Sequence, residues 1–284
     1  MPSEFTPPPP SPPPPPLIPI LPAPWALRAE LHIFLAPQAR NPPPSPFAAA
    51  NPNSAPEILQ GLPAGAYHPL EAVHPAALAG RQWAGGAGKV VLARYEDSPA
   101  GAYSELMYVS DFRSAGGARE AARITNVYVS TEAGVWNGRR NHSFPMHLAR
   151  FDYTRTPDGR TLLRVSHPAD APAPLTAERP FFVARLTPSR IPLLPVAAAL
   201  LPSSLSRIPL VVGNAESTPW LVSTPVFKGH WGVAYIEEVP EAEDGVEGMG
   251  DGVGYPRVRP WSAGVRFEGI LEDPKPTVME SEED

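Results

Sequence analysis

Proline is the residue type that most constrains this sequence, because it accounts for 42 of the 284 residues. A proline ring fixes φ and removes a backbone donor, so proline is excluded from helix interiors and central strands. The excess prolines gather in residues 1–24 and 42–56. We therefore expect regular structure outside these segments, and we assign residues 1–24 as a disordered, proline-rich, polyproline-like leader.

Short segments rich in β-branched and aromatic residues follow from residue 89 onward, separated by glycine, proline or serine. This pattern is typical of strands joined by turns. The predicted strands are Lys89–Tyr95, Glu105–Val109, Ile124–Val129, His147–Tyr153, Thr161–His167, Phe181–Leu186, Leu221–Phe227 and Gly232–Glu237. Many short strands of this kind predict a mostly β fold, either a barrel or a sandwich.

One helix is predicted among these strands, over residues 131–141. Thr131 can act as its N-cap, and Glu132 is favourable near the positive end of the helix dipole. Gly134 and Gly138 lie four residues apart on one face, and each costs about 1 kcal/mol of helix stability relative to alanine. We expect that these glycines allow the helix to approach a sheet closely.

The sequence becomes acidic and glycine-rich after Glu237 and ends in Glu-Ser-Glu-Glu-Asp. Low hydrophobicity with many like charges favours a solvated chain. We therefore assign residues 25–238 to one folded domain and residues 239–284 to an acidic, mostly disordered tail, with a short docked piece at Trp261–Leu271. A second, weaker helix is predicted at Val196–Leu201.

Charge and cysteine content exclude several classes of function. The net charge of −6, without a long lysine or arginine block, argues against nucleic-acid binding. The sequence has no cysteine, which excludes disulfides, thiolate zinc sites and cysteine nucleophiles. The most apolar stretch, residues 191–212, is broken by four prolines and carries Arg207, so it does not predict a membrane span. Since we find no secretory signal, we expect a soluble, cytoplasmic protein.

The sequence contains no complete motif for a metal site or a hydrolase nucleophile. His142 and His147 flank Pro145, but no third ligand stands at the spacing that a zinc site requires. No Gly-x-Ser-x-Gly elbow is present, so a hydrolase triad has no anchor. We therefore predict no metal and no cofactor.

Three segments, taken in order, resemble acetoacetate decarboxylase and its relatives. They are Gly101-Ala102-Tyr103-Ser104-Glu105, then Tyr128–Ala133 with Gly138-Arg139, then Phe144-Pro145-Met146-His147-Leu148-Ala149. In that family, a strand ending in Tyr-x-Glu precedes a strand and a helix carrying Gly-Arg, followed by Pro-Lys-x-Leu-Gly/Ala. The resemblance covers about residues 89–153 and is greatest to the fungal branch. It implies a closed antiparallel β-barrel with a few peripheral helices and, since family enzymes are commonly oligomeric, a homo-oligomer.

The resemblance also implies a catalytic site. In acetoacetate decarboxylase, a lysine of lowered pKa forms an imine with a β-keto acid, and the protonated imine accepts the electrons released with CO2. Here Glu105 corresponds to the pocket glutamate, Met146 stands at the position of the lysine, and His147 stands at that of a second cation. Three further residues are assigned pocket or structural roles by the same resemblance, namely Tyr103, Arg139 and Phe144.

Met146 is the main departure from the family pattern, because a thioether cannot form an imine. The three lysines of the chain are Lys89, Lys228 and Lys275. Lys275 lies in the predicted tail, and the other two lie at predicted strand ends, where lysine is usually a solvated edge residue. Transfer of the nucleophile to Lys89 or Lys228 is therefore not favoured.

Three hypotheses of function remain open. The first is an enzyme acting on a β-keto or other enolisable carbonyl acid, by decarboxylation or by aldol or dehydration chemistry, with Glu105 and His147 as base and acid. The second is a catalytically inactive barrel that binds a small carboxylic acid or a polyketide-like ligand. The third is an interaction protein that uses its proline-rich and acidic tails. Two structural roles compete with catalysis: a wall histidine bonded to backbone for His147, and a strand-edge carboxylate paired with an arginine for Glu105.

Overall fold

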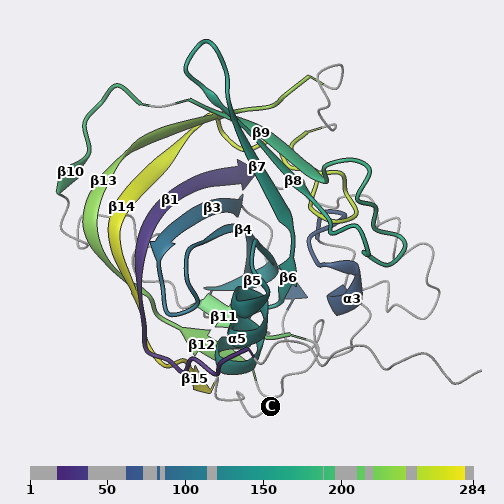
Figure 1. Cartoon of the computed structure of the whole chain (residues 1–284), viewed down its shortest axis with the longest axis vertical. Coiled ribbons are helices and arrows are strands. Elements are labelled where there is room, and N and C mark those ends of the chain that lie inside the picture. Colours follow the sequence, from purple (N-terminus) through teal and green to yellow (C-terminus); the bar gives the residue numbers. More distant parts are fainter. Residues whose placement is uncertain are drawn as a thin grey trace, which may run out of the picture.

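The computed structural model describes residues 18–37, 62–72, 82–83, 87–113, 120–187, 189–195, 210–214, 220–240 and 248–278. These residues form one large β-sheet with the helices α3 (Pro69–Ala72) and α5 (Glu132–His142) (Figure 1). The longer strands are β1 (Trp25–Pro37), β3 (Ala87–Asp97), β4 (Tyr103–Arg113), β5 (Glu120–Val129), β7 (Arg150–Arg155), β8 (Thr161–Ser166), β9 (Phe182–Thr187), β13 (Val226–Glu237) and β14 (Ala263–Asp273). The shorter strands are β2 (Gln82–Trp83), β6 (Met146–Leu148), β10 (Leu194–Pro195), β11 (Leu210–Val212), β12 (Leu221–Ser223) and β15 (Thr277–Val278).

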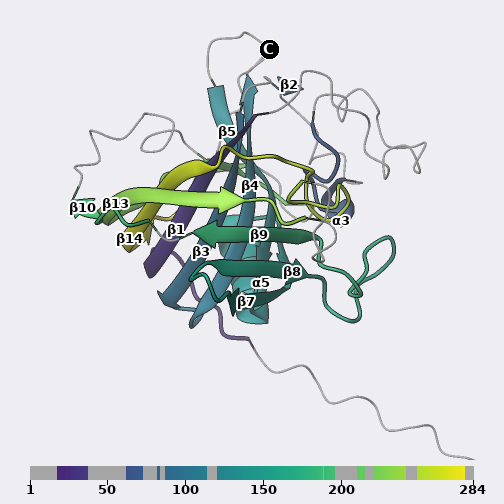
Figure 2. The ribbon, with the colours of Figure 1, turned by 90° about the horizontal axis from the view of Figure 1, so that it is seen from above.

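The long strands are antiparallel neighbours in the order β5-β4-β3-β1-β14-β13-β9-β8-β7. Beyond β5 the sheet continues into β11, β12 and β15, and β11 is parallel to β5. Figure 1 shows β13, β14, β1, β3 and β4 as nested arcs with α5 on their open side. In Figure 2, β13, β9 and β8 cross the direction of β1, β3 and β4, so the sheet is strongly twisted.

Among the described residues, hydrogen bonding does not close this sheet into a barrel. The bonded path has two ends, β15 and β7. The short strand β6 pairs with β5, and β7 begins after one further residue, Ala149, whose N–H donates to the carbonyl of Val129. Chain continuity, rather than a ladder of hydrogen bonds, therefore connects β5 to β7. The mostly β fold is confirmed, but the predicted closed barrel is not.

Two hydrophobic clusters lie on opposite faces of the sheet, because successive strand residues point to opposite sides. On one face, Leu92 and Leu106 pack with Leu163 of β8, and we call this the β8 face. On the other, Ala93 and Tyr103 pack in the cluster that contains Met146, and we call this the α5 face. Each fully buried large side chain contributes about 1.5–3 kcal/mol by leaving water.

Helix α5 forms as its sequence predicts. The Thr131 side chain accepts a hydrogen bond from the backbone N–H of Gly134, and Ser143 ends the helix in the left-handed conformation, with φ of 55°. A Cβ on Gly138 would overlap the Sδ of Met146. Glycine at position 138 therefore permits the close approach of helix and sheet that the sequence predicts. Neither described helix is long and apolar enough to cross a membrane.

The N-terminal boundary of the folded part lies before residue 25. The backbone N–H of Leu21 donates to Asn137 Oδ1 at 2.8 Å, and Asn137 Nδ2 donates to the carbonyl of Pro19 at 3.1 Å. Asn141 Nδ2 donates to the carbonyl of Leu21 at 2.9 Å. The last residues of the predicted leader are therefore bound to α5, since helix side chains satisfy their backbone groups.

The predicted C-terminal boundary of the folded domain, at residue 238, is too early in the chain. Strand β14 lies between β1 and β13 in the middle of the sheet, within the segment assigned to a disordered tail. Met249, Tyr255 and Val258, which precede it, are buried in the cluster of the β8 face. The docked piece expected at Trp261–Leu271 corresponds to this strand. Acidic and glycine-rich composition misled the assignment, because long-range pairing outweighs local preference in sheets.

The sequence predicted that Lys89 and Lys228 are solvated residues at strand ends, and the structure agrees for only one of them. Lys89 is 6% exposed, in β3 between β1 and β4, so its assignment as a solvated edge residue was wrong. Lys228 is exposed, and its Nζ lies 2.6 Å from Glu272 Oε1. The weaker helix predicted at residues 196–201 falls outside the described residues.

Candidate active site

A cavity of about 70 Å³ lies on the α5 face, between the sheet and the end of α5. Its polar side chains are those of Tyr95, Tyr103, Glu105, His142, Ser223 and Asp273. The apolar part of the wall includes Trp25, Met107, Phe144 and Met146. Four of the residues assigned from the resemblance, Tyr103, Glu105, Phe144 and Met146, therefore line one cavity.

Glu105 is a buried carboxyl in this cavity, with 3% of its surface exposed. The hydroxyl of Tyr95 donates to its Oε1 at 3.3 Å. Burial raises the pKa of Glu105 to about 8, and the nearby charge of Asp273 acts in the same direction, although the Tyr95 hydrogen bond opposes them. Glu105 is therefore mostly protonated at neutral pH and can donate a hydrogen bond as an acid.

The two cavity tyrosines also remain protonated. The rings of Tyr95 and Tyr103 lie 4.6 Å apart between centroids. Burial raises the pKa of both hydroxyls well above their usual range, and the charge of Glu105 adds to this effect. Neither tyrosine therefore supplies an anion to the cavity at neutral pH.

His142 and Asp273 form a second pair of titratable groups in the same cavity. Nδ1 of His142 lies 3.3 Å from Oδ2 of Asp273, within ion-pair distance but without hydrogen-bond geometry. Ser223 Oγ donates to the other carboxylate oxygen of Asp273 at 2.7 Å, and the ring of Trp25 packs edge-on against His142. A carboxylate beside Nδ1 favours the tautomer that leaves Nε2 as the acceptor.

Met146 occupies the wall of the cavity and is 4% exposed. It lies opposite Val127 in the parallel pairing of β5 with β6, and its thioether fits against the bare backbone of Gly138. An unbranched thioether adapts well to an irregular space of this kind. The position that the resemblance assigns to a lysine is therefore filled by an apolar side chain beside Glu105.

His147 does not face this cavity, and the predicted pairing of Glu105 with His147 was wrong. Successive residues of β6 point to opposite faces, so His147 lies on the side away from Met146. Its Nε2 is 2.9 Å from Oε1 of Glu71, and its ring stacks on that of His68 with centroids 3.4 Å apart. The structure agrees better with a structural role for His147 than with a catalytic one. Its hydrogen-bond partner is the Glu71 carboxylate, however, rather than the backbone group that the structural role predicted.

Glu71 connects His147 to the arginine of α5. Arg139 Nη1 donates to Glu71 Oε1 at 2.6 Å and to the carbonyl of Met146 at 3.2 Å. Burial alone would raise the pKa of Glu71, but hydrogen bonds from His147 and Arg139 and the charge of Arg139 lower it to about 2. Burial and the neighbouring cations hold the pKa of His68 far below its usual range, so His68 is neutral. Arg139 therefore fixes the backbone of β6 from behind the cavity.

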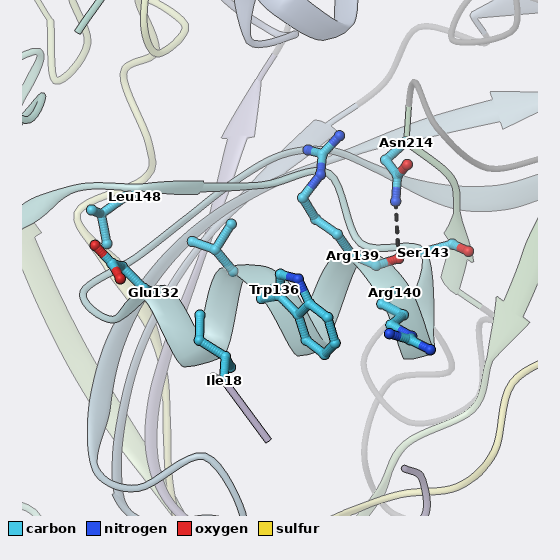
Figure 3. A pocket seen from close by; sticks show the side chains of 9 residues that line it. Ile18, Glu132, Trp136, Arg139, Arg140, Ser143, Leu148 and Asn214 are labelled. Atoms are coloured by element: carbon cyan, nitrogen blue, oxygen red, sulfur yellow. Dashed lines mark hydrogen bonds between the residues drawn. The ribbon is translucent and has the colours of Figure 1, made fainter. Parts of the chain in front are cut away.

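A larger pocket of about 670 Å³ lies along another side of α5 and shares no residue with the Glu105 cavity. Figure 3 shows Trp136 and Arg140 along the helix, with Ile18 below it. Asn214 donates to the backbone carbonyl of Arg139 at 3.2 Å (Figure 3). The titratable groups suited to acid–base chemistry gather in the smaller cavity, so we place the candidate site there rather than in this larger pocket.

Sequence reasoning missed three polar residues of the cavity. Asp273 lies in the segment predicted to be a tail, and Tyr95 and Ser223 belong to no motif. His142 was considered only as a metal ligand with His147, whereas the two side chains lie on opposite faces. In the part of the chain that the structure describes, no group of three or more histidine, cysteine, aspartate or glutamate residues is arranged to hold a metal.

Comparison with known proteins found similarity in structure. No family model matches the sequence, and no curated protein matches it significantly. Acetoacetate decarboxylase from Legionella pneumophila superimposes with a TM-score of 0.54 at 15% identity, covering 92% of this chain and 89% of that one. The chain has the acetoacetate decarboxylase fold. A second structure of acetoacetate decarboxylase gives a TM-score of 0.53 at 10% identity, covering 93% of each chain.

The same fold also occurs in MppR, an enzyme of enduracididine biosynthesis. MppR superimposes on this chain with a TM-score of 0.53 at 16% identity, covering 93% of this chain and 90% of that one. MppR has been solved with pyruvate, and with the condensation product of pyruvate and imidazole 4-carboxaldehyde. The acetoacetate decarboxylase fold is therefore found in more than one kind of enzyme, and identities at this level show the fold alone. The assignment to the fungal branch stays a prediction.

Replacing Glu71 with glutamine should destabilise the protein at neutral pH and not at low pH. Because the pKa of Glu71 is lowered on folding, its stabilisation is present above the unfolded value of about 4.3 and disappears as pH falls through about 2. We expect the free energy of unfolding of Glu71→Gln to be roughly 2–4 kcal/mol below that of the wild type at pH 7. The difference, measured by urea denaturation, should shrink between pH 5 and pH 2.

The matched control for this prediction is Glu237→Gln, which removes a more exposed carboxylate paired with Arg160. Exposed ion pairs contribute about 0–1 kcal/mol, so this variant should change stability little at any pH. A Glu71→Gln variant with wild-type stability at pH 7 would contradict the buried ion-pair network.

Proposed function

We propose that the protein is an enzyme acting on a small enolisable carbonyl acid by acid–base chemistry, without a lysine imine. The observation that carries this proposal is one buried cavity that contains both a carboxyl of raised pKa, Glu105, and the neighbouring side chains of His142 and Asp273. A buried carboxyl of raised pKa in a cavity with other acid–base side chains is a common feature of catalytic sites. The reaction is either decarboxylation of a β-keto acid or enolisation that leads to aldol or dehydration chemistry.

In decarboxylation, protonated Glu105 would donate a hydrogen bond to the ketone oxygen of the substrate. As the bond between the α-carbon and the carboxylate carbon breaks, CO2 leaves. The electron pair of that bond becomes the double bond of the enol. The proton of Glu105 neutralises the ketone oxygen and gives the enol. In ketonisation the enol hydroxyl returns this proton to Glu105, and the carbon takes one proton from water. Glu105 thus supplies the stabilisation of negative charge that the imine supplies in acetoacetate decarboxylase.

In enolisation, His142 would remove the proton next to the carbonyl. Asp273 beside Nδ1 would hold the ring and stabilise the imidazolium, which leaves Nε2 to accept the proton. Glu105 has the same role as before, as the donor to the carbonyl oxygen. Both reactions therefore use Glu105 as the donor to the carbonyl oxygen. Enolisation breaks a C–H bond and also needs His142 as a base, whereas decarboxylation breaks a C–C bond and needs no base in the forward step.

The size of the cavity limits the substrate. Its volume of about 70 Å³ is well below the ~300–1,000 Å³ of pockets that hold drug-sized ligands. A carbonyl acid of a few carbon atoms is therefore the expected substrate, rather than a polyketide-like molecule. Pyruvate, which MppR binds, is an acid of this class.

A binding protein without turnover is the second candidate function. Met146 favours it, because an apolar thioether stands where the resemblance places the nucleophile. In that case, variants at Glu105 or His142 would change affinity for the acid and would have no rate to change. The third hypothesis concerns the two tails. Residues 1–17 of the first lie outside the described residues, whereas most of the second is described and contributes β14 to the sheet.

The proposal is tested by two rates, which are CO2 release from acetoacetate and other short β-keto acids and deuterium exchange next to the carbonyl of pyruvate. Loss of a positioned acid or base typically costs about 10²–10⁴ in rate. We therefore expect Glu105→Gln to lower kcat/KM for both reactions by this factor. His142→Asn should lower exchange more than CO2 release, since only exchange needs a base in the forward step.

His230→Asn is the matched control, because His230 is an exposed histidine of β13 that does not line the cavity. This variant should retain wild-type rates. Turnover that survives both Glu105→Gln and His142→Asn would overturn the assignment of the site. Absence of turnover with every acid, together with saturable binding that Glu105→Gln weakens, would favour the binding protein.

Met146→Lys should introduce imine chemistry into the cavity. The new amine would project from β6 beside Gly138 into the space that also contains Glu105. We expect borohydride to trap an adduct of this variant with acetoacetate, detected by mass spectrometry as a modification at position 146. Burial lowers the pKa of an amine, which favours the neutral nucleophile.

His147→Lys is the control for this experiment, because it places an amine one residue away on the opposite face, next to Glu71. Glu71 would hold that amine as an ammonium group, so no adduct should form. A folded Met146→Lys variant without a trapped adduct would count against the position assigned to Met146.

A further inference from the structure

A second cavity, of about 130 Å³, opens on the β8 face, away from Glu105. Residues of β1, β3, β7, β9, β13 and β14 contribute to its wall, so both halves of the twisted sheet enclose it. It shares no residue with the candidate active site. The proposed function makes no use of it.

Positive charge dominates the lining of this cavity, with three arginines against one glutamate. Arg266 is neutralised, since its Nη2 lies 3.0 Å from Glu30 Oε1 and also contacts Glu268. Arg94 and Arg155 have no ion-pair partner among the described residues. Two exposed guanidinium groups therefore remain available at the opening.

The two available arginines lie near Tyr153, one by a contact with its ring and the other by its position on the same strand. Arg94 extends from β3, and its Cζ lies 5.0 Å from the ring centre of Tyr153 on β7. Arg155 follows Tyr153 by two residues, on the same face of β7 and about 7 Å along the strand. The guanidinium groups thus approach the opening from two different strands.

Two buried donors of the lining have no hydrogen-bond partner among the described residues. They are the Nε of Arg266 and the hydroxyl of Thr187. A buried donor without a partner costs about 1–3 kcal/mol, so such groups are rare in native proteins. An anion in the cavity would supply acceptors for them.

His32 lines the same cavity, and its pKa responds to the charges around it. Burial, followed by the charges of Arg266 and Arg94, lowers its pKa to about 4. His32 is therefore neutral at pH 7, although Glu30 lies 3.6 Å from its Nε2. The charges of Arg266 and Arg94 thus act on His32 in the same direction as burial, which agrees with the excess of arginine in the lining.

We propose that this cavity binds a small carboxylate-bearing anion, held between Arg94 and Arg155. A planar carboxylate matches the fork of a guanidinium group, which makes it a better partner than a spherical anion. The volume of 130 Å³ accommodates a short dicarboxylate, with one carboxylate at the opening and the other directed toward Thr187 and Arg266. This site is separate from the cavity that contains Glu105.

The experiment is isothermal titration calorimetry of the full chain at constant ionic strength, with succinate, acetate and inorganic phosphate as probes. We expect succinate to bind in a saturable manner and more tightly than acetate or phosphate. Arg94→Gln and Arg155→Gln should each weaken succinate binding about tenfold, as for lost hydrogen bonds to a charged group. Arg94→Lys should weaken it less, because the charge remains without the fork.

Arg150→Gln is the matched control, since Arg150 is exposed on the same strand but on its opposite face. It should leave succinate binding unchanged, and so should Glu105→Gln, which alters the other cavity. Three results would overturn the proposal: no saturable binding of succinate, binding unaffected by both arginine variants, or binding lost in Glu105→Gln. Phosphate binding at least as tight as that of succinate would replace a carboxylate site with a general anion site.

Discussion

The contact between α5 and β6 determines the geometry of the candidate active site. Gly138 leaves no side chain on the helix where the Met146 thioether packs, so helix and strand lie closer than any other residue at 138 would allow. This contact completes one wall of the cavity and positions His142 at the end of the helix. Arg139 then holds the β6 carbonyl from the other side, with Glu71 as its counter-ion.

The alternation of side chains along β6 separates two groups that are adjacent in sequence. Met146 faces the cavity with Glu105, whereas His147 faces Glu71 and His68. An acidic carboxyl of raised pKa and one of lowered pKa therefore lie on opposite faces of the same sheet. The first environment is suited to proton donation and the second to a fixed ion pair, since burial favours the neutral form unless cations are close.

The sequence predicted α5 and most of the strands after residue 89, because each depends on a local pattern. The family resemblance, rather than a local pattern, placed Glu105 and Met146 in one pocket, and the two line one cavity. Residues 25–37 were not assigned to a strand. They contain alanine, leucine, glutamate and arginine, which favour helices, and they are extended because β3 and β14 pair with them on both sides. The partner of His142, Asp273, was missed for a similar reason. The sequence of β14 does contain a pattern typical of a strand. Its apolar residues Val265, Phe267 and Leu271 stand at even spacing and lie on the α5 face.

The central claim is that Glu105 is a neutral acid in the cavity at physiological pH, so its own titration tests it most directly. The measurement is the 13C NMR shift of the labelled Glu105 side-chain carboxyl as a function of pH, assigned by its loss in Glu105→Gln. We predict a midpoint near 8, because burial and Asp273 outweigh the Tyr95 hydrogen bond. A midpoint close to the ordinary value for glutamate, about 4.3, would mean that the carboxyl is ionised and would contradict the account.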